Sequence, residues 1–180
     1  MPFTDLLRLT VFLTGAEATA LGAVTVVSAG GKDDTLTLLV AAGWWPIAVI
    51  IGLYLGRRSR AADGVRDLLT AARTTTSLPD ESPGRIALER LWPIGLTALI
   101  AGVLGFLYPG VTAIGTGYAL LVALAWRNRE AAVLGIEDRD GVKFFVEPSS
   151  ALRPVQLVRT PGLGRDRVQP GHPPPPPPAI

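Results

Sequence analysis

TLTLLVAAGWWPIAVIIGLYLG, residues 35–56, carries no charged side chain along its whole length. A helix of about 20 residues rises about 30 Å, the thickness of the hydrocarbon core of a bilayer. The stretch lacks the regular alternation of apolar and polar residues that a strand of a membrane β-barrel shows. A helix also satisfies its backbone hydrogen bonds internally, as the interior of a bilayer demands. The sequence therefore predicts a transmembrane helix here.

Three further apolar stretches have a similar character: residues 6–29, 91–108 and 111–126. The two shorter ones would span a bilayer with the help of their flanks. Hydrophobic residues make up 48% of the chain and charged residues only 18%, against about 25% charged in ordinary soluble domains. This composition favours a membrane protein over a soluble protein with buried helices. We expect an all-α membrane protein in which residues 1–130 form a domain of four transmembrane helices.

The distribution of cations predicts the orientation of these spans. Residues 57–90 carry seven arginines and residues 127–180 carry eight lysines or arginines, whereas the connections at residues 30–34 and 108–110 carry only Lys32. By the positive-inside rule, both termini and the loop 57–90 face the cytoplasm. Arginine also far outnumbers lysine, which is typical of proteins from GC-rich bacterial genomes. We therefore expect a multi-pass protein of the bacterial plasma membrane.

The first span has a second interpretation, as a signal peptide cleaved after the small residues 27–29. Against this, Asp5 offsets Arg8 ahead of the apolar run, and Glu17 interrupts the run itself. The run is also longer than the usual apolar region of about 7 to 15 residues. These features favour an uncleaved helix. Cleavage would leave three spans with the same orientation.

Residue types exclude most kinds of site chemistry. The chain has no cysteine, which excludes disulfides and thiolate sites, and its one histidine, His172, lies in a proline-rich segment. No spacing of nucleophile, acid and base suggests a catalytic set, so we expect that the protein is not an enzyme. We also expect no cofactor, no metal and no nucleic acid, because no matching motif accompanies the basic residues.

Glu17 is the ionisable residue that lies deepest in the predicted spans. A charge near the centre of a bilayer costs about 2.5 to 3.5 kcal/mol, so Glu17 should be neutral, paired or turned into the bundle. It could be a proton-binding carboxyl of a transport pathway, or a protonated structural group that donates one hydrogen bond between helices. Tyr118 lies at a similar depth in the fourth span and is the best candidate partner.

Two features of the second span predict how it packs. Gly52 and Gly56 have the spacing that lets helix backbones approach closely, either within one bundle or between copies. Pro46 follows Trp44 and Trp45 near the middle of the span and should kink the helix. The kink could line a transport site, or the proline could be tolerated beside a packed aromatic pair.

Two segments outside the spans have recognisable patterns. Residues 60–77 place apolar side chains at helical spacing, which predicts an amphipathic helix at the inner membrane surface, where its arginines could attract anionic lipid. After the fourth span we expect the helix to continue to about Leu134 and to stop at Gly135. Residues 131–160 should then contain a small cytoplasmic segment resembling a β-hairpin.

Within this segment, VKFFVEP at residues 142–148 alternates like a strand, and Ile136 and residues 152–159 could supply its neighbours. Phe144 and Phe145 place one aromatic ring on each face, which suggests a strand for docking a partner. The segment is too small to form its own core, so it should pack on the bundle, on the amphipathic helix or on a partner.

Residues 161–180 are rich in proline and end in a run of six consecutive prolines before Ala179. Such a run favours polyproline II, which needs no internal hydrogen bonds, and we expect a disordered tail. The tail could be an inert tether or a ligand for an aromatic groove.

Together these patterns predict a small, non-enzymatic accessory or scaffold subunit of a membrane assembly. The alternative is a small proton-coupled transporter or channel in which several copies assemble around Glu17. The expected partners are the lipid bilayer, with anionic lipid at the inner face, and other membrane subunits or further copies of the chain.

Overall fold

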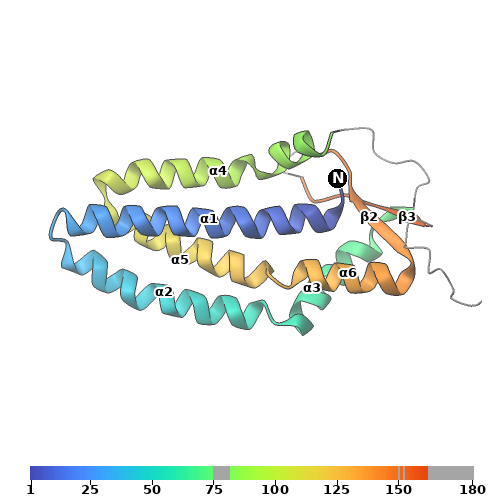
Figure 1. Cartoon of the computed structure of the whole chain (residues 1–180), viewed down its shortest axis with the longest axis horizontal. Coiled ribbons are helices and arrows are strands. Elements are labelled where there is room, and N and C mark those ends of the chain that lie inside the picture. Colours follow the sequence, from blue (N-terminus) through green and yellow to red (C-terminus); the bar gives the residue numbers. More distant parts are fainter. Residues whose placement is uncertain (75–81, 150, 152, 162–180) are drawn as a thin grey trace, which may run out of the picture.

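The computed structural model describes residues 1–74, 82–149, 151 and 153–161. Four long helices lie side by side, and the shorter elements gather at one end of them (Figure 1). The helices are α1 (Phe3–Gly30), α2 (Thr35–Leu55), α3 (Arg58–Thr70), α4 (Pro83–Leu107), α5 (Pro109–Trp126) and α6 (Arg129–Asp140). The strands are β1 (Arg73–Thr74), β2 (Val142–Val146) and β3 (Leu157–Pro161). We call α3, α6 and the three strands the cap.

Four helical stretches of the described residues are long and apolar enough to cross a membrane: α1, α2, α4 and the stretch that begins with α5. They coincide with the four stretches expected from the sequence. The prediction of a mostly helical chain with four helices able to span a membrane is therefore confirmed, and this supports a membrane protein. Large apolar side chains of α2 and α4, such as Leu39, Leu99 and Phe106, face outward, as contact with lipid requires.

α5 is the central helix of the bundle. It packs along both α1 and α2 and also contacts α4. Its buried face consists mainly of small residues, namely Pro109, Thr112, Ala113, Thr116, Gly117 and Ala119. In a bilayer, helices associate through van der Waals packing rather than through the hydrophobic effect, so small side chains at the interface allow the close approach that this packing needs.

α4 begins earlier than the sequence predicted, at Pro83 rather than near residue 91. A proline is favourable in the first turn of a helix, because its missing N–H would have no partner there. The extra two turns carry Ile86, which is 1% exposed and belongs to the core of the cap. Pro93 consequently lies inside α4 rather than at its start.

The predicted helix stop at Gly135 is wrong. The helix is interrupted at Arg127 and Asn128, and α6 then continues through Gly135 to Asp140. It ends at Gly141, whose φ of 63° lies in the left-handed region that favours glycine. Gly135 needs no such conformation, and the buried side chains of α6 on either side of it hold the helix in place.

The cap contains a three-stranded sheet in the order β1-β3-β2. β2 and β3 are antiparallel, with Val142 opposite Pro161 and Val146 opposite Leu157, which confirms a small sheet in this part of the chain. The proposed strand at Ile136 is wrong, since that residue lies in α6. The third strand is β1, from the connection before α4, and it pairs parallel with β3.

The largest buried apolar cluster lies in the cap and not in the bundle. It joins the start of α1 to α3, α4, α6 and the sheet, through Met1, Phe3, Leu6, Leu7, Val65, Leu69, Ile86, Val133, Val142, Phe144, Val146 and Leu157. The Val146 N–H also donates to the Met1 carbonyl at 2.9 Å. The sheet therefore packs on the start of α1, one of the surfaces that the sequence suggested for it, and shares its apolar cluster with the amphipathic helix α3.

Polar contacts hold together the junction between the bundle and the cap. The Arg8 guanidinium of α1 donates to Glu130 of α6, with 2.6 Å between Nη2 and Oε1. The side-chain amide of Asn128, at the break between α5 and α6, donates to the carbonyl of Gly56 at 2.6 Å. This bond satisfies a free carbonyl at the end of α2 and fixes that end against α5.

Residues 162–180 lie outside the described residues, and so does the proline-rich tail predicted there apart from Pro161, which ends β3.

Glu137 places a carboxyl in the core of the cap. It lies on α6, is 6% exposed, and accepts a hydrogen bond from the Phe144 N–H at 3.0 Å. Burial raises the pKa of Glu137, and the bond from Phe144 and the charge of Lys143 oppose only part of this effect. Between the ordinary and the raised pKa, the folded protein binds more protons than the unfolded chain. The free energy of unfolding therefore falls as the pH rises through that window.

Replacing Glu137 with Gln should remove this pH dependence and raise the stability at neutral pH, because the amide keeps an acceptor for Phe144 without burying a charge. Glu137→Ala should lower the free energy of unfolding by about 1–3 kcal/mol, since the Phe144 N–H would lose its acceptor. Thermal unfolding of the protein in detergent, from mildly acidic to mildly alkaline pH, measures both effects. The exposed neighbour Asp138, changed to Asn, is the matched control. An unaltered pH dependence in Glu137→Gln would contradict this account.

Candidate functional site

Glu17 lies in the middle of α1 and lines a groove between α1 and α4. The groove has a volume of about 630 Å³. Every other side chain along it is apolar or small: Leu9, Leu13, Ala16, Ala20, Gly84, Ala87, Leu88, Leu91, Trp92, Ile94, Gly95 and Ala98. Glu17 is half-buried at this surface. The groove therefore presents one ionisable group on an apolar background.

Within the part of the chain that the structure describes, Glu17 makes no hydrogen bond and no ion pair. Tyr118, its expected partner, is 58% exposed and packs edge-on against Trp44, with 5.5 Å between the ring centroids. The structure thus does not bring the two candidates together. The sequence gives the depth of a residue in the bilayer but not the face of the bundle on which it lies.

Small residues surround Glu17 on the outer surface of α1. A second, shallow hollow beside the groove is lined by Val11, Phe12, Gly15, Ala16, Thr19, Ala20 and Ala23. Across the groove, a Cβ built on Gly95 of α4 would meet no atom within 4 Å. Another helix could therefore approach the backbones of α1 and α4 closely on this face.

The two tryptophans of α2 attach this helix to α5. The indole N–H of Trp45 donates to the Ala113 carbonyl at 2.9 Å, and that of Trp44 donates to the Ile114 carbonyl at 3.2 Å. Gly117 provides the space for the Trp44 ring, because a Cβ there would fall on the indole nitrogen. This geometry favours the interpretation of a packed aromatic pair beside a tolerated proline.

Gly52 and Gly56 lie at the same interface, nearer the cap. A Cβ on Gly52 would lie 2.9 Å from Leu124 Cβ and 3.0 Å from the Leu121 carbonyl oxygen. A Cβ on Gly56 would overlap the Leu124 carbonyl oxygen. The backbones of α2 and α5 are therefore in direct contact along this pair of glycines.

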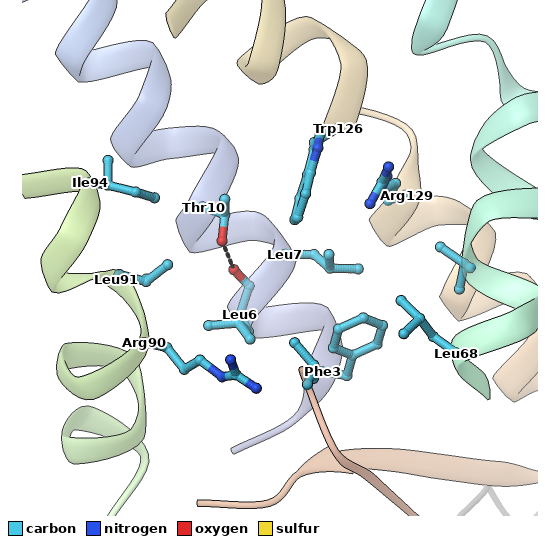
Figure 2. A pocket seen from close by; sticks show the side chains of 12 residues that line it. Phe3, Leu6, Leu7, Thr10, Leu68, Arg90, Leu91, Ile94, Trp126 and Arg129 are labelled. Atoms are coloured by element: carbon cyan, nitrogen blue, oxygen red, sulfur yellow. Dashed lines mark hydrogen bonds between the residues drawn. The ribbon is translucent and has the colours of Figure 1, made fainter. Parts of the chain in front are cut away.

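An apolar cavity of about 220 Å³ lies where the bundle meets the cap. Figure 2 shows its walls, which include Phe3, Leu6 and Leu7 of α1, with Arg90 and Arg129 on different sides. Arg90 donates to the Arg153 carbonyl at 2.7 Å. It thereby ties the segment before β3 to α4.

Phe144 and Phe145 both lie against other parts of this chain. Phe144 is 3% exposed in the core of the cap, and Phe145 is half-buried where β2 bridges to Pro2. Docking of a partner through Phe144 would require the cap to open, whereas Phe145 is only half-buried. The described residues contain no group of three or more acidic or histidine side chains that could hold a metal.

Gly52→Leu should force α2 away from α5. It should lower the free energy of unfolding by about 1–3 kcal/mol, as overpacking does in a tight interface. Gly43→Leu, on the same helix, is the matched control, because a Cβ at Gly43 meets no atom within 4 Å. Thermal unfolding of both variants in detergent measures the difference. Equal stability of the two variants would show that the contact at Gly52 is not needed.

No family model, curated protein or solved structure matches this chain. Its role therefore has to be inferred from the chemistry of its own residues. Among these, Glu17 in the groove between α1 and α4 forms no hydrogen bond or ion pair with the described residues.

Proposed function

We propose that the protein is a non-enzymatic accessory subunit of a membrane assembly, and that the groove between α1 and α4 receives a transmembrane helix of its partner. The observation that carries this proposal is the position of Glu17, which faces an apolar groove without a partner among the described residues. A carboxyl left facing lipid near the middle of a bilayer costs about 2.5 to 3.5 kcal/mol. A docked helix would remove that contact and supply a hydrogen-bond partner.

The walls of the groove suit a helix as occupant. Small residues such as Ala16, Ala20 and Gly95 allow two backbones to approach, which is the main source of helix affinity in lipid. One hydrogen bond to Glu17 would add about 0.6 to 2 kcal/mol and fix the register of the partner. A partner helix with a serine, threonine, asparagine or cationic residue at mid-depth matches these requirements.

A role without catalysis is supported by the placement of the ionised groups. In the described residues, carboxylates pair on the surface with nearby arginines, as in Arg85–Glu89 and Arg139–Asp140. None of these pairs forms a nucleophile and base that converge on a pocket. They are consistent with solvated surfaces of an interacting subunit.

We place the cap in the cytoplasm of a bacterial cell, following the positive-inside rule. Among the described residues, every lysine and arginine except Lys32 lies in the cap, in its connections or near the ends of α1 and α4 beside it. At the far end, Lys32 donates to the Phe106 carbonyl at 2.7 Å and so serves the end of α4. Both termini of the chain would then lie on the cytoplasmic side.

A photo-crosslinking residue at Ala20 should form one discrete adduct with a partner protein in native membranes, because Ala20 lines the groove. Glu17→Gln should keep most of this adduct, since an amide still forms the hydrogen bond, whereas Glu17→Leu should reduce it several-fold. The same probe at Leu39 of α2, which is 66% exposed to the lipid side, is the matched control and should give no discrete adduct.

The identity of the adduct separates the possible roles. An adduct with a different protein supports an accessory subunit. An adduct with a second copy of this chain overturns that proposal in favour of an oligomer, in which Glu17 could couple proton transport. Proton flux into liposomes, abolished by Glu17→Gln, would then be the result that establishes transport. Identical patterns from Ala20 and Leu39 would show that the groove has no specific occupant.

A further inference from the structure

A second pocket, separate from the groove at Glu17, lies between α2, α3 and α5 at the junction of the bundle with the cap. Its volume is about 620 Å³. Leu121, Val122 and Ala125 form an apolar wall on α5, and Arg60, Asp63 and Arg129 contribute the charged side chains. The pocket therefore combines a surface continuous with the membrane-spanning part of α5 and a charged region at the end of the bundle.

Arg129 is the central cation of this pocket. Its guanidinium carbon lies 4.2 Å from the centroid of the Trp126 ring, so one face of the group is covered by the indole. Burial lowers the pKa of Arg129, and within the described residues its side chain forms no ion pair and no hydrogen bond. The N–H groups of a half-buried guanidinium need acceptors, and here the described residues supply none.

The other charges of the pocket leave it net positive. Arg60 donates to the Tyr54 hydroxyl at 3.1 Å and lies over the same ring, which positions its guanidinium at the edge of the pocket. Asp63 is the one carboxylate that lines the pocket, and it also lies 3.9 Å from Arg66. The pocket is thus lined by two arginines and one carboxylate, and the carboxylate also lies near Arg66.

The position of the pocket at the ends of the predicted spans indicates which class of ligand it could bind. Trp126 ends the membrane-spanning helix α5, and Tyr54 lies at the end of α2. Tryptophan and tyrosine at the ends of spans mark the level of the lipid headgroups. A basic pocket between transmembrane helices at this level is the arrangement that binds anionic lipid headgroups. A guanidinium can donate two parallel hydrogen bonds to one phosphate.

We propose that this pocket binds an anionic phospholipid from the leaflet at the capped end, with its phosphate on Arg129 and Arg60 and an acyl chain along Leu121 and Val122. This proposal does not depend on the role of the groove at Glu17. The sequence predicted only a general attraction of anionic lipid to the arginines of the amphipathic helix. Of these arginines, Arg60 alone lines the pocket, together with Arg129, so the proposal assigns the lipid to one place. An acyl chain on the apolar wall favours a lipid over a free phosphate ion.

The full-length protein in detergent, titrated with phosphatidylglycerol that carries brominated acyl chains, tests the proposal by quenching of tryptophan fluorescence. Quenching should saturate, and it should be weaker with brominated phosphatidylcholine, which has no net charge. Trp126→Phe should remove the saturable part of the signal, which assigns it to this pocket. Arg129→Gln should weaken the apparent affinity about tenfold, in line with the loss of charged hydrogen bonds.

Arg139→Gln is the matched control, because Arg139 lies on the same helix α6 but pairs with Asp140 on the surface. It should leave the affinity for phosphatidylglycerol unchanged. Arg129→Lys keeps the charge and should bind more tightly than Arg129→Gln, which separates loss of the site from loss of folding. Equal affinities of Arg129→Gln and Arg139→Gln, or equal affinities for the two lipids, would overturn the proposal. Displacement of the lipid by millimolar inorganic phosphate would overturn it in favour of a site for free anions.

Discussion

The close approach of α2 to α5 is the constraint on which the rest of the structure depends. In a bilayer, burying an apolar side chain between two helices gains little, because lipid is equally apolar, so helices associate where their backbones can touch. Gly52, Gly56 and Gly117 remove the side chains that would keep these two helices apart. The indoles of Trp44 and Trp45 then donate to carbonyls of α5 across the same interface.

The cap follows a different physical rule, because its short elements gather at one end of the long apolar helices. There the hydrophobic effect operates, and the largest apolar cluster of the protein forms from short pieces of six elements. None of these pieces is large enough to fold alone, and the start of α1 supplies Phe3, Leu6 and Leu7 to their common core. The first helix therefore belongs both to the bundle and to the core of the cap.

Arg129, at the junction between the bundle and the cap, forms no hydrogen bond or ion pair with the described residues. Trp126 and Arg129 form a wall common to the apolar cavity of the junction and to the pocket between α2, α3 and α5. Glu17 lies deeper, in the groove between α1 and α4. Guanidinium and carboxyl groups are costly to desolvate without partners, so each of these places is a reason to expect a ligand or a partner from outside the chain.

Sequence alone determined the four spans, their approximate limits and the strand at VKFFV, because length, polarity and alternation are read directly along the chain. It also marked Glu17, Gly52 and Gly56 as exceptional for a membrane segment. It misplaced the stop of α6 at Gly135, because a glycine by itself does not end a helix; α6 ends at Gly141, where the backbone turns left-handed. It could not find β1, whose two residues become a strand only beside β3. Nor could it show that Glu17 and Tyr118 lie apart, or that Arg60 and Arg129 line the same pocket. Which side of a helix meets which neighbour depends on contacts between residues far apart in the chain, and only the tertiary structure decides these.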